Sequence, residues 1–536
     1  MMAQSPPPRS LTSPRPPAPP GIVASPWHHA LAQPDRPAVI VADTGETLSY
    51  GDMIRGANRL ANLFVGLGLR PGDCVAFCLE NHIRYGELVW AAKAAGLYYV
   101  CIARQSGVDD LRYVLTNCGA RVFIASAAVA DTAVAASRDL PGLMAFMIDG
   151  EAPGFASYEA AVAGQDDQPV EDRSRGASML YSSGTTGRPK GIRHPLQPVS
   201  PHVAPPRHRQ MVETYGFGEG MVLLNPGPLY HTGPLRFMMH AQRAGGTVIV
   251  FRKFDAEAVL RAISRHQVTH GLFVPTMFVR MLALPDAVKT VAELGSLRVV
   301  IHIAAPISIP TKRRMIDWFG PVLHEMYGGT ESVGTTVITS SEWLAHPGSV
   351  GRPSAGTELH IVDEQGEECP VGVPGLIYMS SGKTFEYHGE AVKTAASRHA
   401  MGWYTLGDVG YVDDDGYLYL TDRQSNLIIS GGVNIYPREV EMVLADHPAV
   451  ADVAVLGVPD PDFGEAVRAV VVCRLPAVSG DDLARELMAF CRARLNPVKC
   501  PRMIDFVAEL PRSEAGKILR ADLRRRYWPE GAGLVV

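Results

Sequence analysis

The sequence predicts an α/β protein with a large N-terminal domain of layered α/β sheets and a small α+β C-terminal domain. Short apolar runs alternate with segments of helical spacing along most of the chain. Such uniformly apolar strands are typical of buried, largely parallel sheets. The alternation stops near residue 411, and the 536 residues exceed the roughly 250–300 that one core sustains. We therefore expect at least two domains.

The N-terminal elements can be read in order. Residues 1–22 are rich in proline and have no long apolar stretch, which predicts a disordered tail. Residues 37–43 predict a strand, and Ser49 with Asp52 forms the capping pattern that begins a helix. Apolar residues continue at helical spacing until Gly68, which suits the end of that helix.

The same two patterns recur further along the chain. Strands are predicted at 74–80, 121–126, 246–251, 270–275 and 298–304, and a second helix at 84–96.

The C-terminal region has a different organisation. Residues 411–423 predict a hairpin that turns around Asp415 and Gly416, and a short strand ending in paired glycines follows within 427–437. Strands at 450–459, 465–474 and 503–510 and a helix at 481–495 then form a compact α+β unit. We place the N-terminal domain at 23–422 and the C-terminal domain at 423–536.

Composition narrows the classes of function. The formal net charge of −5 argues against general binding of nucleic acid. The eight cysteines are scattered, as in proteins of a reducing compartment. No apolar run reaches the roughly 20 residues of a transmembrane segment. We expect a cytoplasmic protein that binds small molecules, with a homo-oligomer left open.

The most informative segment is YSSGTTGRPKG at 181–191. Its glycines let backbone N–H groups approach a ligand, its hydroxyls donate hydrogen bonds, and Arg188 and Lys190 neutralise charge. These are the requirements of polyphosphate binding, although the spacing differs from the GxxxxGK[ST] loop. A flexible surface turn is the other interpretation of this composition.

This string resembles the phosphate-loop signature of the adenylate-forming (AMP-binding) superfamily, and four further segments match that superfamily in order. They are YGGTES (327–332), GWYTLGD (402–408), DRQSNLIISGGVNIYPREVE (422–441) and PRSEAGKILR (511–520). The resemblance covers roughly residues 25–520 and is strongest to the acyl-CoA synthetase, or acid–CoA ligase, branch. It implies that the small C-terminal domain is a mobile lid.

The resemblance also implies roles for individual residues. The nucleotide is expected to contact Ser182, Ser183, Gly184, Thr185, Thr186, Gly187, Lys190, Ala304, Ala305, Tyr327, Asp408 and Arg423. Thr330 is expected at the α-phosphate and Glu331 at Mg²⁺. Asp408 resembles the carboxylate that accepts the ribose hydroxyls. Taken alone, a glutamate such as Glu331 is more often a helix-start or solvated carboxylate than a functional one.

Lys517, within PRSEAGK, resembles the catalytic lysine of the family. An acid and a polyphosphate repel each other, and the transition state gathers negative charge on the α-phosphate. A cation held against that oxygen lowers the barrier. No general base is needed, because a carboxylate is already ionised at neutral pH. Without the resemblance, Lys517 reads as an exposed lysine.

The acid and thiol sites are implied in the same way. The acyl pocket is expected to include His231, Val274, Thr276, His302, Gly328 and Gly329. Its apolar strings favour a fatty, alicyclic, steroid-side-chain or aromatic acid. Gly431 and Gly432 resemble the segment that faces CoA, with a simple β-turn as the alternative. Ser425 occupies the hinge position, where the family commonly has Asp or Lys. The basic run 524–526 is either a CoA phosphate contact or a solvated helix face.

The predicted function is an acid–CoA ligase that uses ATP, Mg²⁺ and CoA. A ligase that loads a carrier protein in trans is the principal alternative. A luciferase-like oxygenase and a non-catalytic binding protein on the same fold are the others. The presence of Lys190, Glu331, Asp408, Arg423 and Lys517 favours an enzyme over a binding protein.

Overall fold

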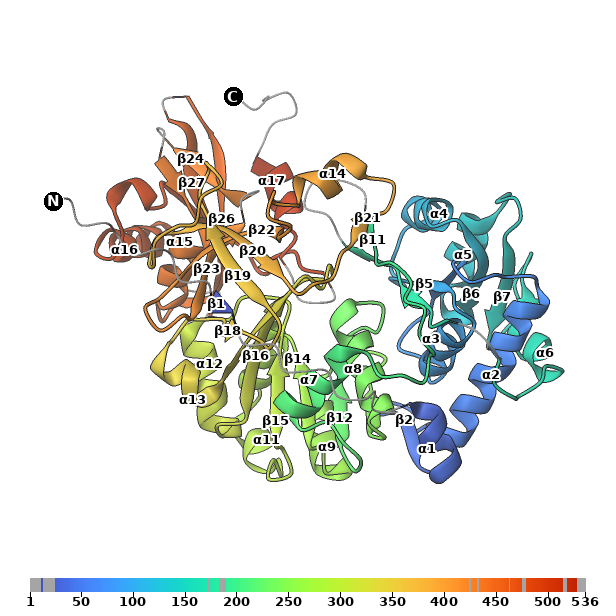
Figure 1. Cartoon of the computed structure of the whole chain (residues 1–536). Coiled ribbons are helices and arrows are strands. Elements are labelled where there is room, and N and C mark those ends of the chain that lie inside the picture. The colour runs from blue at the N-terminus through green and yellow to red at the C-terminus, as the bar shows by residue number, and fades with distance from the viewer. Residues whose placement is uncertain are drawn as a thin grey trace.

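The computed structural model describes residues 11–12, 25–170, 174–182, 189–423, 426–430, 433–461, 463–474, 479–513 and 518–527. Helices flank large sheets through the first part of the chain, and a smaller α+β unit follows (Figure 1). The predicted fold class, with its large N-terminal and smaller C-terminal domain, is confirmed. Among the described residues no helix is both long enough and apolar enough to cross a membrane.

A nine-stranded sheet forms the base of the N-terminal domain. Its strands lie in the order β18 (Arg352–Pro353), β17 (Thr335–Thr339), β16 (Leu323–Gly328), β15 (Val299–His302), β14 (His270–Phe273), β12 (Val222–Asn225), β13 (Thr247–Val250), β2 (Pro37–Val41) and β3 (Thr47–Ser49). The strands from β16 to β2 are parallel, and the pairs at both ends are antiparallel. This agrees with the uniformly apolar strands that the sequence predicts.

A six-stranded parallel sheet lies beside it, on the right of Figure 1. Its order is β8 (Ala156–Ser157), β7 (Met144–Ile148), β6 (Ala120–Ser126), β4 (Cys74–Cys78), β5 (Tyr98–Ile102) and β9 (Ala177–Ser178). One hydrophobic core joins the two parallel sheets, because it contains Val75 of β4, Val248 of β13 and the helices between them. Those helices are α2 (Tyr50–Gly66), α3 (Tyr85–Ala94) and α8 (Thr232–Arg243).

Helix α2 follows directly from its sequence. The Ser49 side chain accepts a hydrogen bond from the backbone N–H of Asp52 at 3.1 Å, as the capping pattern predicts. The Asp52 carboxylate accepts the Ser49 hydroxyl at 2.8 Å. Gly68, just after the helix, has φ +77°, a left-handed conformation that glycine adopts without steric cost.

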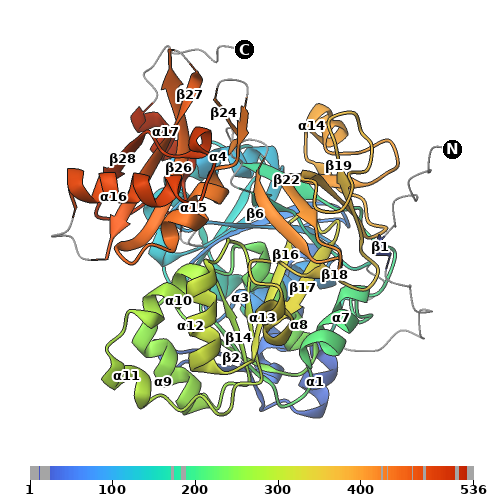
Figure 2. The ribbon, with the colours of Figure 1, turned by 90° about the vertical axis from the view of Figure 1, so that its left-hand side faces the viewer.

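The remaining helices of the N-terminal domain cover the sheets (Figure 2). They are α1 (Pro26–Ala32), α4 (Val108–Asn117), α5 (Ala130–Ser137), α6 (Tyr158–Ala163), α7 (Pro206–Tyr215), α9 (Ala256–His266), α10 (Pro275–Leu282), α11 (Asp286–Thr290), α12 (Ile309–Phe319), α13 (Ser340–Ala345) and α14 (Ala391–Ala396).

Two antiparallel sheets complete the N-terminal part. One has the order β1 (Leu11–Thr12), β19 (Glu358–Val362), β20 (Gly375–Ser380), β22 (Tyr404–Val412) and β23 (Leu418–Arg423). The other consists of β10 (Leu180–Ser182), β11 (Lys190–Arg193) and β21 (Glu386–Tyr387). The hairpin predicted at 411–423 is confirmed by β22 and β23. The prediction of a disordered tail is wrong at residues 11–12, because β1 pairs with the edge strand β19.

The C-terminal unit contains β24 (Ile428–Ser430), β25 (Val433–Ile435), β26 (Val450–Asp460), β27 (Gly464–Cys473) and β28 (Met503–Phe506). Its helices are α15 (Pro437–Ala445), α16 (Asp481–Arg492) and α17 (Arg520–Tyr527). The predicted strands and the helix at 481–495 are confirmed. Helix α15, which the sequence analysis leaves unassigned, begins at Pro437, and the fixed φ of proline suits a first turn.

Candidate active site

The expected site residues gather at one edge of the nine-stranded sheet. The parallel strands β12, β14, β15 and β16 are neighbours, so their carboxyl ends lie side by side. His231 follows β12, Val274 and Thr276 follow β14, Ala304 follows β15, and Thr330 follows β16. In parallel sheets of this kind, ligands bind in the crevice outside the carboxyl ends of the strands.

The segment after β16 is packed closely against its surroundings. The hydroxyl groups of Thr330 and Thr232 lie 2.9 Å apart, which joins this segment to the first turn of α8. A Cβ atom on Gly329 would lie 2.5 Å from a carboxylate oxygen of Glu331, and one on Gly328 would lie 2.7 Å from the Thr335 side chain. A side chain at either position would therefore displace its neighbours, Glu331 at the first and Thr335 at the second.

Asp408 reaches this segment from the antiparallel sheet. It is 7% exposed, and its Oδ2 accepts a hydrogen bond from the Tyr327 hydroxyl at 2.7 Å. Asp408 is also the register partner of Arg423 across β22 and β23. The structure thus brings together two residues that are separated by 81 positions in the chain and were expected at the nucleoside.

The strands β10 and β11 frame the expected phosphate loop. Ser182 and Lys190 are register partners, so the two ends of the loop lie directly opposite each other. The Lys190 Nζ lies 5.5 Å from the ring centroid of Tyr387. The Tyr387 hydroxyl donates a hydrogen bond to Glu331 Oε1 at 2.9 Å. Tyr387 therefore links the end of the loop to the carboxylate expected at Mg²⁺.

The expected adenine slot contains an unusual backbone conformation. Ala304 has φ +73°, in the left-handed region that non-glycine residues rarely adopt, and Ser332 has φ +57°. Ala304 is exposed and Ala305 is half-buried, so neither is a core residue. Strained backbone of this kind often occurs at ligand sites.

The expected acyl-pocket residues differ in environment. His231 is half-buried, precedes α8 as its N-cap and lies 4.3 Å from the Tyr230 ring, between ring centroids. Val274 is 7% exposed, and Thr276 is half-buried in the first turn of α10. These positions form a partly apolar wall.

His302 is more deeply buried than the other residues expected in the acyl pocket. It is fully buried and its ring lies 5.7 Å from that of Phe278. Burial lowers the pKa of His302 to about 3, with the Lys312 cation adding and the Glu325 carboxylate opposing. His302 is therefore neutral at physiological pH.

Part of the expected site lies outside the described residues. This holds for Ser183, Gly184, Thr185, Thr186, Gly187, Ser425, Gly431, Gly432 and Lys517. For Ser182 and Arg423 only the strand positions are described.

The structure adds residues that the sequence analysis misses. Arg236 on α8 donates a hydrogen bond from Nη2 to the carbonyl of Thr330 at 3.3 Å, and its Nη1 bonds Ser332 Oγ. From the C-terminal unit, the backbone N–H of Arg438 donates to Asp422 at 2.9 Å, and its side chain is 8% exposed. Arg236 belongs to none of the quoted motifs, and Arg438 lies within the segment 422–441 without an expected role, so the fold reveals both contacts.

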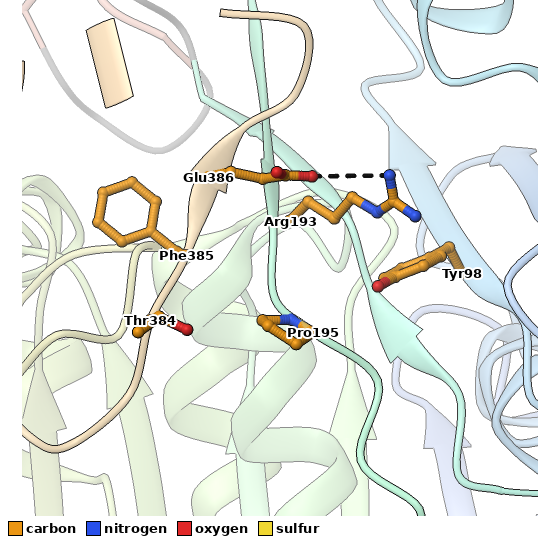
Figure 3. Close-up of a pocket in the computed structure, with 6 residues that line it drawn as sticks. All are labelled: Tyr98, Arg193, Pro195, Thr384, Phe385 and Glu386. Atoms are coloured by element: carbon orange, nitrogen blue, oxygen red, sulfur yellow. Dashed lines mark ion pairs between the residues drawn. The ribbon is translucent and has the colours of Figure 1, made fainter. Parts of the chain in front are cut away.

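A cavity of about 380 Å³ lies next to these elements. It is lined by Tyr98, Arg193, Pro195, Thr384, Phe385 and Glu386 (Figure 3). Arg193 forms an ion pair with Glu386 at 3.6 Å, and its guanidinium lies 4.6 Å from the Tyr98 ring centroid. The charge of Arg193 is therefore balanced.

Comparison with known proteins places this arrangement in a family. Residues 26–386 match the AMP-binding enzyme family, and residues 439–517 match the AMP-binding enzyme C-terminal domain. A feruloyl-CoA synthase of an Amycolatopsis species is 34% identical over 507 residues, which are 94% of this chain and 98% of that protein. A fatty acid–[acyl-carrier-protein] ligase of Streptomyces coeruleorubidus is 30% identical over 522 residues, which cover 95% and 97% of the two chains.

The solved structures agree. The ATP-bound MatB from Rhodopseudomonas palustris superposes with a TM-score of 0.81 at 28% identity, covering 94% of this chain and 99% of that one. The chain therefore belongs to the AMP-binding, adenylate-forming family of enzymes and is an acid–thiol ligase of the AMP-forming, acid–CoA ligase kind.

Proposed function

We propose that this ligase joins a carboxylic acid to ATP as acyl-AMP, with release of pyrophosphate, and then transfers the acyl group to the thiol of CoA. The observation that carries this assignment is the convergence of Tyr327, Asp408 and Glu331 at one edge of the parallel sheet. The bond from Tyr327 to Asp408 joins the expected nucleoside positions, and the bond from Tyr387 connects Glu331, expected at Mg²⁺, to the residue beside Lys190.

In the first step the acid carboxylate attacks the α-phosphate and pyrophosphate leaves. The carboxylate needs no activation by a base, so the enzyme's task is to hold two anions together. We assign the Thr330 hydroxyl to the α-phosphate, beside Thr232 at 2.9 Å. Lys190, at the end of the loop frame, is assigned to the polyphosphate. Lys517 is assigned to the oxygen on which charge develops, by its place in the C-terminal motif.

Glu331 fits a magnesium site. Mg²⁺ commonly takes one or two protein carboxylates and completes its shell with phosphate oxygens and water. Glu331 accepts one hydrogen bond on Oε1, from Tyr387, and this bond orients the carboxylate. Bound there with ATP, Mg²⁺ would neutralise phosphate charge.

We assign the second step to the C-terminal domain, taken as 423–536. Gly431 and Gly432 are proposed to face CoA, and Ser425 to be the hinge about which this domain reorients as a mobile lid. Arg438 supports contact between the two parts, since its pKa is lowered by burial while Glu325 and Asp422 oppose that effect. Glu325 belongs to β16, so α15 lies close to the base of the site.

A carrier-protein thiol is the second candidate acceptor. It is favoured by the similarity to the Streptomyces coeruleorubidus protein, whose name gives an acyl carrier protein as its acceptor. The acid itself is proposed to be fatty, alicyclic, steroid-side-chain or aromatic, in keeping with the buried, apolar Val274.

The test is pyrophosphate release from ATP and Mg²⁺ across a panel of acids, with and without CoA. Acid-dependent release that rises with CoA and yields a thioester supports the proposal. Adenylate that CoA fails to discharge, but a phosphopantetheine carrier protein does, assigns the second acceptor. Release that does not depend on any acid would refute both.

A further inference from the structure

Three cationic side chains lie near the candidate site. Arg207, Arg236 and Lys383 come from α7, α8 and the segment between β20 and β21. Among the described residues none of them forms an ion pair, whereas Arg193 nearby pairs with Glu386. Unpaired charge that is enclosed by protein is costly and is commonly completed by a ligand of opposite charge.

Arg236 is fixed against the reactive segment. It lies one helical turn after Thr232 on α8, so both side chains leave the same face of the helix. Its guanidinium donates to the Thr330 carbonyl and to Ser332, and it is half-buried. Burial and the nearby Arg207 cation lower the pKa of Arg236 to about 10, and Glu331 is the carboxylate that opposes them.

Arg207 contacts a different part of the same segment. It lies in the first turn of α7 and is half-buried. Its Nη2 contacts the Met326 sulfur at 3.2 Å, immediately before Tyr327. A thioether is a weak acceptor, and a guanidinium has five N–H donors in a planar fork. The described residues therefore satisfy the Arg207 guanidinium poorly.

Lys383 adds a third cation. Its side chain is exposed, yet protein surrounds it closely enough that desolvation lowers the pKa of Lys383 to about 8, with Arg207, Arg236 and Arg175 adding to the shift. His194, between two residues of the 380 Å³ cavity, bonds the Thr384 carbonyl through Nδ1 at 3.1 Å. Burial first, and then Arg236, lower the pKa of His194 to about 4, so this ring adds no charge at neutral pH.

Arg207 and Arg236 lie on α7 and α8, and both Thr232 and Arg236 of α8 contact Thr330. The loop frame of β10 and β11 has a cation of its own, Lys190, which lies near the ring of Tyr387, and the Tyr387 hydroxyl donates to Glu331. Helix α8 follows His231, an expected residue of the acid pocket. Because Arg236 lies on the helix that follows His231, we assign the excess of positive charge to the acid side of the site, and Lys190 of the loop frame to phosphate.

We propose that the preferred substrate is a dicarboxylic acid, whose second carboxylate binds Arg207 and Arg236 with Lys383 close by. This inference rests on the proposed function, because it names the acid that the ligase activates. One carboxylate would meet the α-phosphate beside Thr330 while the other occupies the guanidinium pair. Planar guanidinium and carboxylate groups match each other in bidentate geometry.

The experiment compares each dicarboxylic acid with its methyl half-ester, which keeps the length and removes one charge. Aliphatic and aromatic pairs are assayed by pyrophosphate release with the wild-type chain. The dicarboxylic acid is expected to have a kcat/KM about 10- to 100-fold above its half-ester, as expected for hydrogen bonds to a charged group. In Arg207→Met this ratio falls to within about threefold of unity, while the KM for ATP changes little.

Arg209→Met is the matched control, because Arg209 lies on the same helix and pairs with Glu213 at 2.6 Å. It should keep the wild-type ratio. Half-esters or monocarboxylic acids that equal the dicarboxylic acids in the wild type would overturn the inference and leave the ligase assignment standing. A rise in the KM for ATP in Arg207→Met, equal for all acids, would assign the cations to the phosphates instead. Wild-type protein that is silent with every acid would refute the proposed function itself.

Discussion

At the scale of single residues, the Tyr327 hydroxyl is one contact that joins the parallel sheet to the antiparallel one. Tyr327→Phe removes its 2.7 Å hydrogen bond to the buried Asp408 carboxylate. A hydrogen bond to a charged group contributes about 1.5–3 kcal/mol. We expect the KM for ATP to rise about tenfold or more, with a smaller change in the KM for the acid, measured by pyrophosphate release.

Tyr378→Phe is the matched control for this variant. Tyr378 lies on β20, and within the described part of the chain its hydroxyl makes no hydrogen bond. Its kinetics should remain those of the wild type. An unchanged KM for ATP in Tyr327→Phe would remove the nucleoside assignment of the Tyr327–Asp408 pair.

Ala304 stores backbone strain at the expected adenine slot. A left-handed alanine costs roughly 1–2 kcal/mol, and glycine in the unfolded chain costs roughly 0.5–1 kcal/mol. With φ +73°, Ala304→Gly is therefore expected to raise the free energy of unfolding by about 0.5–1 kcal/mol. Ala305, which lies outside the left-handed region, should lose stability when changed to glycine. Denaturant unfolding of the two variants compares them, and equal destabilisation would show that Ala304 carries no strain.

At the scale of secondary-structure elements, a buried ion pair connects α12 to β16. The Lys312 Nζ donates to Glu325 Oε2 at 2.6 Å, and both side chains are buried. Removing one member of a buried pair typically costs about 3–5 kcal/mol, because the other charge stays buried without a partner. Lys312→Met should therefore destabilise the chain strongly, as measured by thermal unfolding.

The double variant Lys312→Met/Glu325→Gln tests the cause. It should recover much of the lost stability, because no buried charge is left unpaired. Arg313→Met, on the exposed side of the same helix, should change little. If the double variant is no more stable than Lys312→Met, packing and not charge dominates this contact.

Some elements and contacts were predictable from the sequence alone, and others were not. The strand at 298–304 and the helix after Ser49 depend on local periodicity and a local cap, so both were predictable. The bond between Tyr387 and Glu331 spans 56 positions, and that between Arg236 and Thr330 spans 94. Such pairs arise from strand order and helix placement, which no local pattern encodes. The prediction of a disordered tail was wrong at residues 11–12 for the same reason, since β1 depends on pairing with β19.

At the scale of the whole molecule, the site lies where three sheets meet. The parallel sheet supplies the segment from Tyr327 to Glu331, the antiparallel sheet supplies Asp408, and the small sheet supplies Lys190 and Tyr387. Tyr327, Glu331, Asp408 and Lys190 were expected from the resemblance, whereas Tyr387 and the cationic excess at Arg207 and Arg236 were not. The sequence segments expected to line the acid pocket are apolar. The charge proposed for this pocket comes from Arg207 and Arg236, on helices outside those segments.

Buried histidines make the stability of the whole chain depend on pH. Burial lowers the pKa of His302 to about 3, and burial lowers that of His208 to about 4. Below the unfolded value of about 6.5, the unfolded chain binds protons that the folded chain does not. Each histidine therefore lowers the free energy of unfolding by up to about 1.4 kcal/mol per pH unit as the pH falls from about 6.5 toward its folded pKa. Above about 6.5 this loss is absent.

Thermal unfolding between pH 7.5 and pH 4.5 measures the effect. His302→Gln removes one titrating ring, so its melting temperature should fall less steeply with decreasing pH than that of the wild type. His28→Gln, at an exposed position, should keep the wild-type slope. Because His302 lies beside Glu325, at 3.5 Å, His302→Gln also tests whether that carboxylate shares the titration. A slope equal to the wild type would mean that His302 takes up its proton in the folded chain, stabilised by Glu325 against the cost of burial.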